Sequence, residues 1–174
     1  MKSEIAKIVD AVAAALNGSV TPPDVIASPF SRATAHYSIL GRFKKQAVEI
    51  IIELYGELLI KLDSDSDYSF SVLPNTRASR LSIFSGRRVH AGHKEFDEAF
   101  VVRITRFPNV QSWLLETEIL SAIRGLAPFK YLKLEQELLR YSSPCDLDHL
   151  STDMVLAKAE VLYNIAASVA RADR

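Results

Sequence analysis

Residues 46–62, QAVEIIIELYGELLIKL, decide the class of fold that we expect for this chain. Apolar residues take every second position at the start of this stretch, and glutamates lie between them. This period of two is typical of a strand that buries one face, and valine and isoleucine favour that conformation. The alternating residues are Val48, Ile50, Ile52 and Leu54, with Glu49 and Glu53 between them. Gly56 then offers a turn into a second strand, Leu58 to Leu62.

The same stretch has an alternative interpretation as a helix. Its polar residues also recur at helical spacing and would form a polar stripe along one side. They are Gln46, Glu49, Glu53, Glu57 and Lys61. We favour strands because β-branched side chains lose rotamer freedom in a helix. Gly56 would also lie in the helix interior, where glycine is about 1 kcal/mol less favourable than alanine.

Further strands are expected where apolar residues alternate or where β-branched and aromatic residues cluster. These segments are residues 34–39, 80–84, 99–106, 129–134 and 137–141. For residues 130–141 a helix is the alternative. Strands that follow one another through short connections form an antiparallel sheet, so we expect that arrangement here.

Helices are expected where apolar residues recur at helical spacing between a capping residue and a stop signal. They are Ser3–Leu16, Asn109–Gly125 and a last helix that is capped by Asp146 or Asp148. Pro22-Pro23 breaks the chain after the first helix. We therefore expect residues 1–20 to form an N-terminal helix or arm, and residues 34–174 to form a single α+β domain. Its curved, mainly antiparallel sheet would have about five to seven strands, covered by two or three helices.

The composition is that of a folded globular chain without a strong overall charge. Of 174 residues, 48% are hydrophobic, and 21 basic residues balance 21 acidic ones. Cys145 is the single cysteine, which excludes an internal disulfide and a multi-cysteine zinc site and fits a reducing compartment. Acids interrupt each apolar run, including Glu4 and Asp10 near the start, so we expect no signal peptide and no membrane segment. The expected location is cytoplasmic.

Residues 90–104, HAGHKEFDEAFVVRI, are the most distinctive stretch in the chain. A structural interpretation accounts for them: Gly92 supplies a positive φ, and Asp97 braces the resulting turn. Phe96 and Phe100, four residues apart, would anchor one side of a helical turn. The functional alternative uses His90, His93 and Asp97 as acid–base groups or metal ligands, although no third metal ligand lies nearby.

Part of this stretch resembles a known signature. Residues 92–102, GHKEFDEAFVV, are similar to the G-x-x-x-F-D-x-x-F-x-V pattern of uncharacterised prokaryotic domains of unknown function. The resemblance implies an α+β fold over residues 37–170 and supplies no activity. Members of that family often carry aspartate directly after the glycine, where this chain has His93.

Residues 75–94 contain basic side chains and no acid. The candidate binding residues are Arg77, Arg80, Arg87, Arg88, His90, His93 and Lys94. Such a patch would bind phosphate, nucleic acid or an acidic protein surface. Only Phe84 interrupts it as an aromatic residue, so base stacking is not indicated. The structural interpretation is a solvated hairpin whose charges protect a sheet edge.

Two weaker motifs and several absent ones limit the chemistry. Residues 63–67, DSDSD, have the spacing of a calcium loop, but Tyr68 and Pro74 replace the required glycine and glutamate. Cys145 and His149 are four residues apart, which is a common chance spacing for a nucleophile and a base. The sequence contains no nucleotide-binding or zinc-protease motif, so we expect no cofactor, no metal and no catalytic residue.

The leading functional hypothesis is a non-enzymatic binding or protein-interaction module. Its partner would be another protein, or a second copy that packs through the apolar helices. Two alternatives remain open. One is a binder of nucleic acid or phosphorylated ligands through residues 77–94, and the other is an unrecognised enzyme that uses His90, His93 and Asp97.

Overall fold

A computed structural model describes residues 2–23, 35–80, 86–107 and 110–172. The strands are β1 (Ser19–Thr21), β2 (His36–Phe43), β3 (Gln46–Glu53), β4 (Glu57–Asp63), β5 (Ser69–Pro74), β6 (Arg87–Val89), β7 (Phe100–Arg106), β8 (Tyr131–Glu135) and β9 (Leu138–Pro144). The helices are α1 (Lys2–Ala15), α2 (Arg77–Arg80), α3 (Lys94–Ala99), α4 (Val110–Leu114), α5 (Thr117–Gly125) and α6 (Thr152–Ala172).

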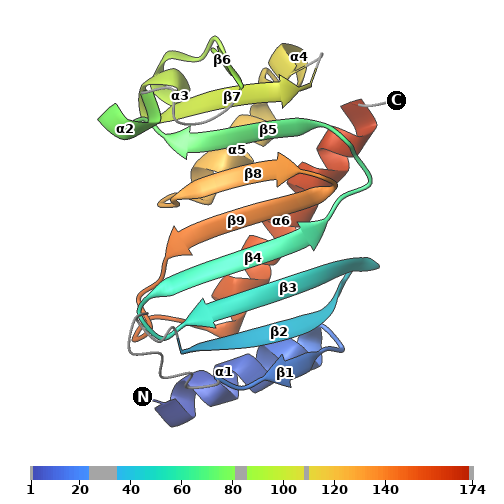
Figure 1. Cartoon of the computed structure of the whole chain (residues 1–174), viewed down its shortest axis with the longest axis vertical. Coiled ribbons are helices and arrows are strands. Elements are labelled where there is room, and N and C mark those ends of the chain that lie inside the picture. The colour runs from blue at the N-terminus through green and yellow to red at the C-terminus, as the bar shows by residue number, and fades with distance from the viewer. Residues whose placement is uncertain (1, 24–34, 81–85, 108–109, 173–174) are drawn as a thin grey trace, which may run out of the picture.

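All nine of these strands form one sheet in the order β1-β2-β3-β4-β9-β8-β5-β7-β6, and each neighbouring pair is antiparallel. The expected α+β class with a mainly antiparallel sheet is confirmed. Figure 1 shows the strands stacked along the long axis of the molecule with α6 crossing behind them. Within the described residues the strands and helices outnumber the predicted five to seven and two or three. The sequence did not predict β1, β5, β6, α2 or α3, and one predicted helix is divided into α4 and α5.

The strand prediction for residues 46–62 is confirmed by β3 and β4, which pair directly through the turn at Gly56. Their alternation divides the two faces of the sheet. Val48, Ile50 and Ile52 are at most 3% exposed and face the helices. Glu49 and Lys61 lie opposite one another on the other face and are partly exposed. The strand pair expected near residues 130–141 is likewise confirmed as β8 and β9.

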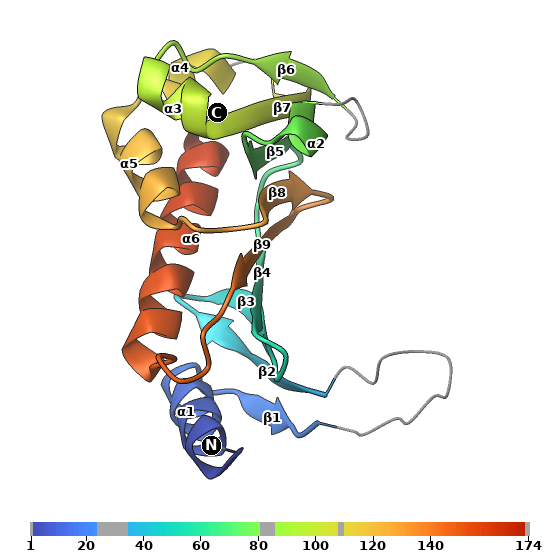
Figure 2. The same cartoon turned by 90° about the vertical axis from the view of Figure 1, so that its left-hand side faces the viewer.

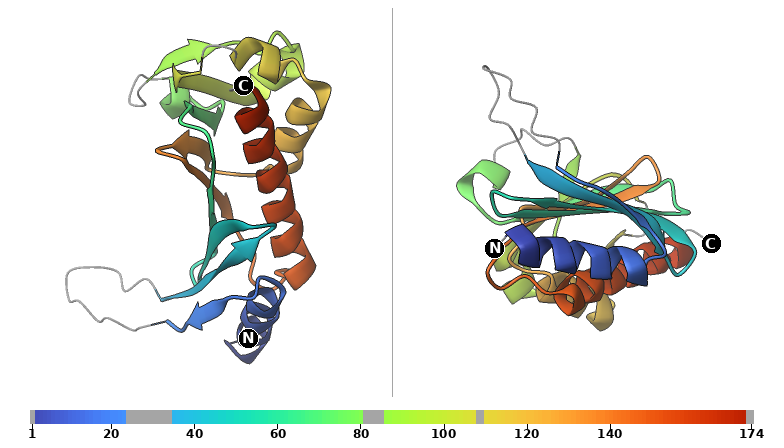
Figure 3. Two further views of the ribbon diagram at one scale, coloured as in Figure 1. Left: turned by 90° about the vertical axis from the view of Figure 1, so that its right-hand side faces the viewer. Right: turned by 90° about the horizontal axis from the view of Figure 1, so that it is seen from below.

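Helix α1 belongs to the same core as the rest of the chain and does not extend as an arm. Its apolar residues and those of α6 are buried in one cluster with the sheet: Ile5, Val9, Val12 and Leu16, and Val155, Leu162, Ile165 and Val169. Figure 3 shows α1 and α6 on the same side of the sheet when the molecule is seen from below. The break at Pro22-Pro23 therefore does not separate residues 1–20 from the core, because β1 returns to pair with β2.

Several element boundaries differ from the sequence prediction. The single helix expected over residues 109–125 is two helices, because Glu116 has extended backbone angles (φ −64°, ψ 115°) between α4 and α5. Arg80, expected in a strand, ends α2, and residues 81–84 of that predicted strand lie outside the described residues.

The cap of the last helix also differs from the prediction. Helix α6 begins at Thr152, where the hydroxyl of Ser151 accepts a hydrogen bond from the Met154 N–H at 3.2 Å. Asp146 instead contacts its own turn: its carboxylate accepts from the Asp148 N–H at 3.1 Å and lies 2.8 Å from the His149 ring. A serine that lies closer to the first turn thus replaces both aspartates as the cap.

Candidate binding surface on the open face of the sheet

In the described part of the chain, the longer helices all lie on one face of the sheet. Figure 2 shows the sheet in profile, with α1, α5 and α6 on one side and only the short α2 on the other. We call this second side the open face. Its central part is formed by the outward residues of four neighbouring strands: Glu49 and Ile51, Leu59 and Lys61, Leu138 and Arg140, and Tyr131 and Lys133.

The strand register aligns charged residues in a row across this face. The row takes one residue from every strand: Ser19, Leu40, Glu49, Lys61, Arg140, Lys133, Ser71, Arg103 and Arg88. Residues directly opposite one another on neighbouring strands share a face, and the strands are about 4.8 Å apart. From β4 to β6 the row therefore brings cations side by side, interrupted only by Ser71. We call it the cross-strand row.

Most of these cations have compensating partners. Lys61 is 2.6 Å from Glu49, and Lys133 is 2.6 Å from Glu135. Arg103 is only 7% exposed and donates to the carbonyls of Ser79 and Gly86 at 3.3 and 3.2 Å. Arg140 differs from these residues. Among the described residues it makes no hydrogen bond or ion pair. Its Nε is buried without a partner, as is the Nε of Arg103.

A groove of about 630 Å³ opens over this part of the sheet. Its aliphatic lining includes Leu40, Leu59 and Leu138, and Leu40 is 51% exposed. Its polar lining is Glu49, Lys61, Asp63, Tyr131 and Arg140. An apolar floor with a few charged groups is the usual composition of a specific binding surface, where aliphatic contacts supply affinity and charges fix the register.

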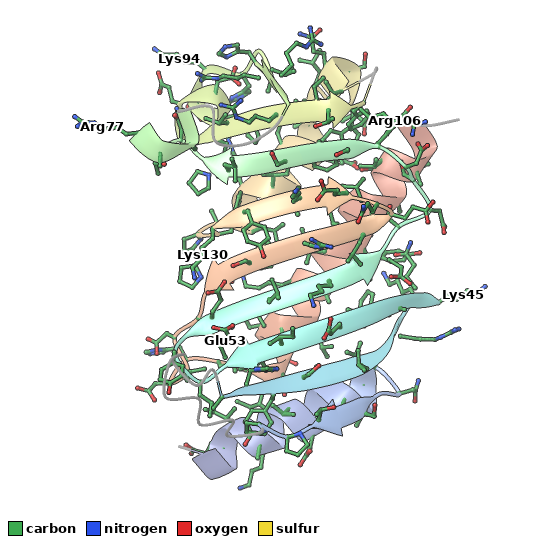
Figure 4. All side chains as sticks on the ribbon, in the orientation of Figure 1. Lys45, Glu53, Arg77, Lys94, Arg106 and Lys130 are labelled. Atoms are coloured by element: carbon green, nitrogen blue, oxygen red, sulfur yellow. The ribbon has the colours of Figure 1, made fainter. Side chains whose placement is uncertain are left out.

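A hydrogen-bonded cluster of Glu57, Ser142 and Lys130 lies beside the groove. Glu57 accepts hydrogen bonds from the Ser142 hydroxyl and from Lys130, whose position on the sheet is labelled in Figure 4. Burial alone would raise the pKa of Glu57, but the two hydrogen bonds and the Lys130 charge outweigh it and hold that pKa below its ordinary value. Burial, followed by the charge of Glu57, raises the pKa of the Tyr131 hydroxyl. Ser142 is fully buried, so this cluster positions strands and presents no accessible nucleophile.

The residues of the predicted basic patch gather at one end of the molecule without forming one surface. Figure 4 shows Arg77 and Lys94 projecting from that end. Arg87 and Arg88 are consecutive on β6 and exposed, so their side chains point to opposite faces of the sheet. Only Arg88 lies on the open face, opposite Arg103. The Arg80 side chain lies outside the described residues.

The histidine stretch has the geometry of a braced turn. Gly92 has φ +79°, and the carboxylate of Asp97 accepts from the N–H groups of Ala91 and Gly92 at 2.8 and 3.1 Å. Phe96 is fully buried, with its ring centroid 5.0 Å from that of Phe100.

The two histidines do not converge with Asp97 on one point. His93 contacts Arg124 at 3.2 Å, whereas the His90 ring lies 4.0 Å from Asp97. Nowhere in the described ranges do three His, Cys, Asp or Glu residues come together as a metal site.

Cys145 is buried at the end of β9. Burial raises the pKa of its thiol, and the nearby Asp146 charge adds to that effect. A thiol with a raised pKa is a poor nucleophile, and His149 is engaged with Asp146. The arrangement is that of a structural cysteine.

The residues that meet on the open face could not be identified from the sequence. The alternation in residues 46–62 marked Glu49 and Lys61 as outward, but the partners of these strands were unknown. Arg140 joins Lys61 only because β9, which follows about eighty residues later, inserts beside β4. A long-range pairing of this kind leaves no local signal in the chain.

Comparison with known proteins gives a fold and no family. No family model and no curated protein matches the chain. Among solved structures, it is similar to the crystal structure of the mycobacterial trehalose monomycolate transport factor A, TtfA. The TM-score is 0.64 with 8% sequence identity, over 94% of this chain and 93% of that one. No described helix is both long and apolar enough to cross a membrane. The similarity of residues 92–102 to the uncharacterised domains stays a prediction, and the structural neighbour shows that this chain shares the fold of TtfA.

Proposed function

We propose that this chain is a non-enzymatic protein-interaction module that holds a partner protein against its open sheet face. The observation that carries the proposal is the uncovered face itself, with its groove of about 630 Å³ and the exposed Leu40. Aliphatic residues beside ordered charges are typical of protein interfaces, in which arginine and tyrosine supply much of the affinity. A cytoplasmic location is part of the proposal and is supported by the single free Cys145.

The helical layer supports this assignment of the face. Self-association through apolar helices was one expectation from the sequence. The most buried apolar residues of α1 and α6 point into the common core, and Met154, Leu156 and Val161 on α6 are partly buried against it. The open face is the broad surface that carries the groove, and we therefore move the proposed interface there.

Position-specific cross-linking tests the proposal. Ala47 lines the groove and is exposed, and Ala157 is an exposed alanine on α6 in the helical layer. A photo-reactive phenylalanine analogue replaces each in turn, in cells that naturally encode the chain. We expect a discrete adduct from position 47 and none from position 157. The partner, identified by mass spectrometry and purified, should bind the wild-type chain and not Ala47→Trp, which fills the groove.

Other results would contradict the proposal. Equal adducts from positions 47 and 157 would show that the face has no special role. An adduct made of two copies of this chain would replace the partner protein with self-association. Circular dichroism and thermal melting of Ala47→Trp serve as the folding control, because the exposed position should tolerate a larger side chain.

A second candidate function rests on the exposed cations at the other end of the molecule. Arg77, Arg87 and Arg88 are exposed and have no ion pair among the described residues. They favour binding of phosphate groups, which would weaken steeply as salt is added. A fluorescent single-stranded oligonucleotide titrated at low salt tests this function. Binding that is lost in Arg87→Ala and Arg88→Ala would support it, and an absence of binding would remove it.

A further inference from the structure

Arg140 is the middle member of three adjacent cations on the open face. In the cross-strand row it stands between Lys61 on β4 and Lys133 on β8, directly opposite both. Each lysine has an acidic partner at 2.6 Å, which is Glu49 for Lys61 and Glu135 for Lys133. Arg140, the middle residue, is the only one of these three cations without an ion pair among the described residues, although its charge interacts with Glu135 over a longer distance.

The environment of Arg140 is unfavourable for its guanidinium in the free chain. Its Nε is shielded from water and lacks a hydrogen-bond partner among the described residues. A buried donor on a charged group is destabilising unless an acceptor or an opposite charge reaches it. Like charges directly opposite on neighbouring strands repel, so Lys61 and Lys133 add to the unfavourable term. A carboxylate that contacts the accessible nitrogens of the guanidinium would relieve the repulsion between these cations.

The surroundings of Arg140 restrict what can bring that carboxylate. Leu59 and Leu138 line the groove together with Arg140, and Tyr131 borders it. We propose that Arg140 anchors an aspartate or glutamate side chain in an extended segment of the partner protein, with aliphatic residues on either side of the acid. This inference rests on the proposed function, and it names the chemistry of the partner segment. The guanidinium supplies a charge-assisted hydrogen bond, and the leucines cover the aliphatic neighbours.

The groove favours a single carboxylate over a polyanion. Glu49 and Asp63 also line it, so its two acids balance Lys61 and Arg140 overall. A nucleic acid strand would bring several phosphates close to these acids, and electrostatic binding needs a net positive surface. Tyr131 is the one aromatic residue in the lining of this groove, which is too few for a base-stacking platform.

Selection from a random peptide library tests the inference without knowledge of the natural partner. Twelve-residue peptides are displayed and selected for binding to the intact chain, and the enriched peptides are then synthesised. We expect them to share one acidic residue flanked by leucine, isoleucine, valine or phenylalanine. Replacing that acid with its amide should weaken binding by about tenfold to a hundredfold, the usual range for a hydrogen bond between charged groups.

Matched variants of the chain locate the contact. Arg140→Leu should weaken binding of the acidic peptides to the same extent as the change to amide, and Arg140→Lys should recover part of it because the charge remains. Arg171→Leu removes an exposed arginine from α6 on the other side of the molecule and should have no effect. Arg140→Leu should bind the amide peptide with no lower affinity than is seen with either change alone, because both changes remove the same contact. Thermal melting of each variant checks that it is folded.

The same experiments distinguish an error in the role of Arg140 from an error in the proposed function of the open face. If the selected peptides lose affinity for Ala47→Trp but bind Arg140→Leu as tightly as the wild type, the proposed role of Arg140 is wrong, and the open face remains the binding site. Peptides that bind equally well to Ala47→Trp would overturn the proposed function itself. If a deoxythymidine oligonucleotide binds in an Arg140-dependent way and no acidic peptide does, a polyanion replaces the partner protein and the inference is wrong.

Discussion

The indole N–H of Trp113 on α4 donates a hydrogen bond to the hydroxyl of Ser168 on α6, at 2.8 Å inside the core. The two residues are only 1% and 3% exposed. The same hydroxyl donates a hydrogen bond to the carbonyl of Ile165 at 2.7 Å. Around this contact the Trp113 ring packs against Phe70 and Phe107, with centroids 5.1 and 5.2 Å away. One polar bond therefore fixes a short helix in an otherwise apolar cluster.

Ser168→Ala is expected to destabilise the chain by about 1–3 kcal/mol, because it leaves the buried indole N–H without an acceptor. Urea unfolding of the wild type and the variant measures the difference. Trp113→Phe removes the donor and part of the ring. The double variant should lose less unfolding free energy than the sum of the losses in the two single variants, since each change removes the same hydrogen bond. Additive losses would show that the two side chains do not interact in solution.

The architecture could be anticipated where the pattern was local. Alternation in residues 46–62 predicted β3 and β4 correctly, because side chains with a period of two can bury only one face of a strand. The break between α4 and α5 could not be foreseen. Leu114, Leu115 and Glu116 are good helix formers, and yet the chain turns after Trp113 and Leu114, which are buried in the core. Tertiary packing rather than propensity sets that boundary.

Gly41→Ala is expected to loosen the attachment of α1 to the sheet. A Cβ at this position would lie 2.7 Å from the Cβ of Leu16 and 2.9 Å from its carbonyl oxygen. The backbone of the α1 C-terminus must therefore move, and overpacking of this kind typically costs about 1–3 kcal/mol. Thermal melting measures the loss.

Gly125→Ala is the matched control, because nothing lies within 4 Å of the added methyl at the end of α5. It should leave the stability unchanged or raise it by up to about 1 kcal/mol, the helix propensity difference. If both alanine variants melt like the wild type, the close approach of Leu16 and Gly41 is absent in solution, and residues 1–20 would behave as the arm that the sequence suggested.

The candidate site was less predictable than the fold. Residues 77–94 suggested a basic patch because their charged residues are close together in the sequence. Strand geometry nevertheless directs the Arg87 and Arg88 side chains to opposite faces of the sheet. The cross-strand row differs: Lys61 is about eighty residues from Arg140 in the sequence and directly opposite it in the sheet. A single sequence contains the alternation that turns each residue outward, but the order of strands comes only from the folded chain.

Asp97→Ala is expected to destabilise the chain by about 1.5–3 kcal/mol, because a charged acceptor of backbone N–H groups is removed from the turn at Ala91 and Gly92. Glu98→Ala is the control: its neighbouring carboxylate is 66% exposed and lies 4.0 Å from Lys94, so its loss should change the stability little. Chemical unfolding measures both variants. A stable Asp97→Ala variant would contradict the turn-bracing role and would reopen the hypothesis that Asp97 serves His90 in catalysis.

Glu57 should make the stability of the chain depend on pH in the acid range. Because its pKa in the folded chain is lowered from the ordinary value of 4.5, ionised Glu57 stabilises the fold at pH values above 4.5. That stabilisation is lost as the pH falls through the lowered folded-state pKa. Glu57→Gln lacks the charge, so the difference in unfolding free energy between wild type and variant should be constant near neutral pH and shrink toward zero in acid. Glu118→Gln, an exposed change on α5, should show no such trend. Urea unfolding across this pH range measures both, and a difference that grows as the pH falls would mean that Lys130 and Ser142 do not hold Glu57 in its ionised form.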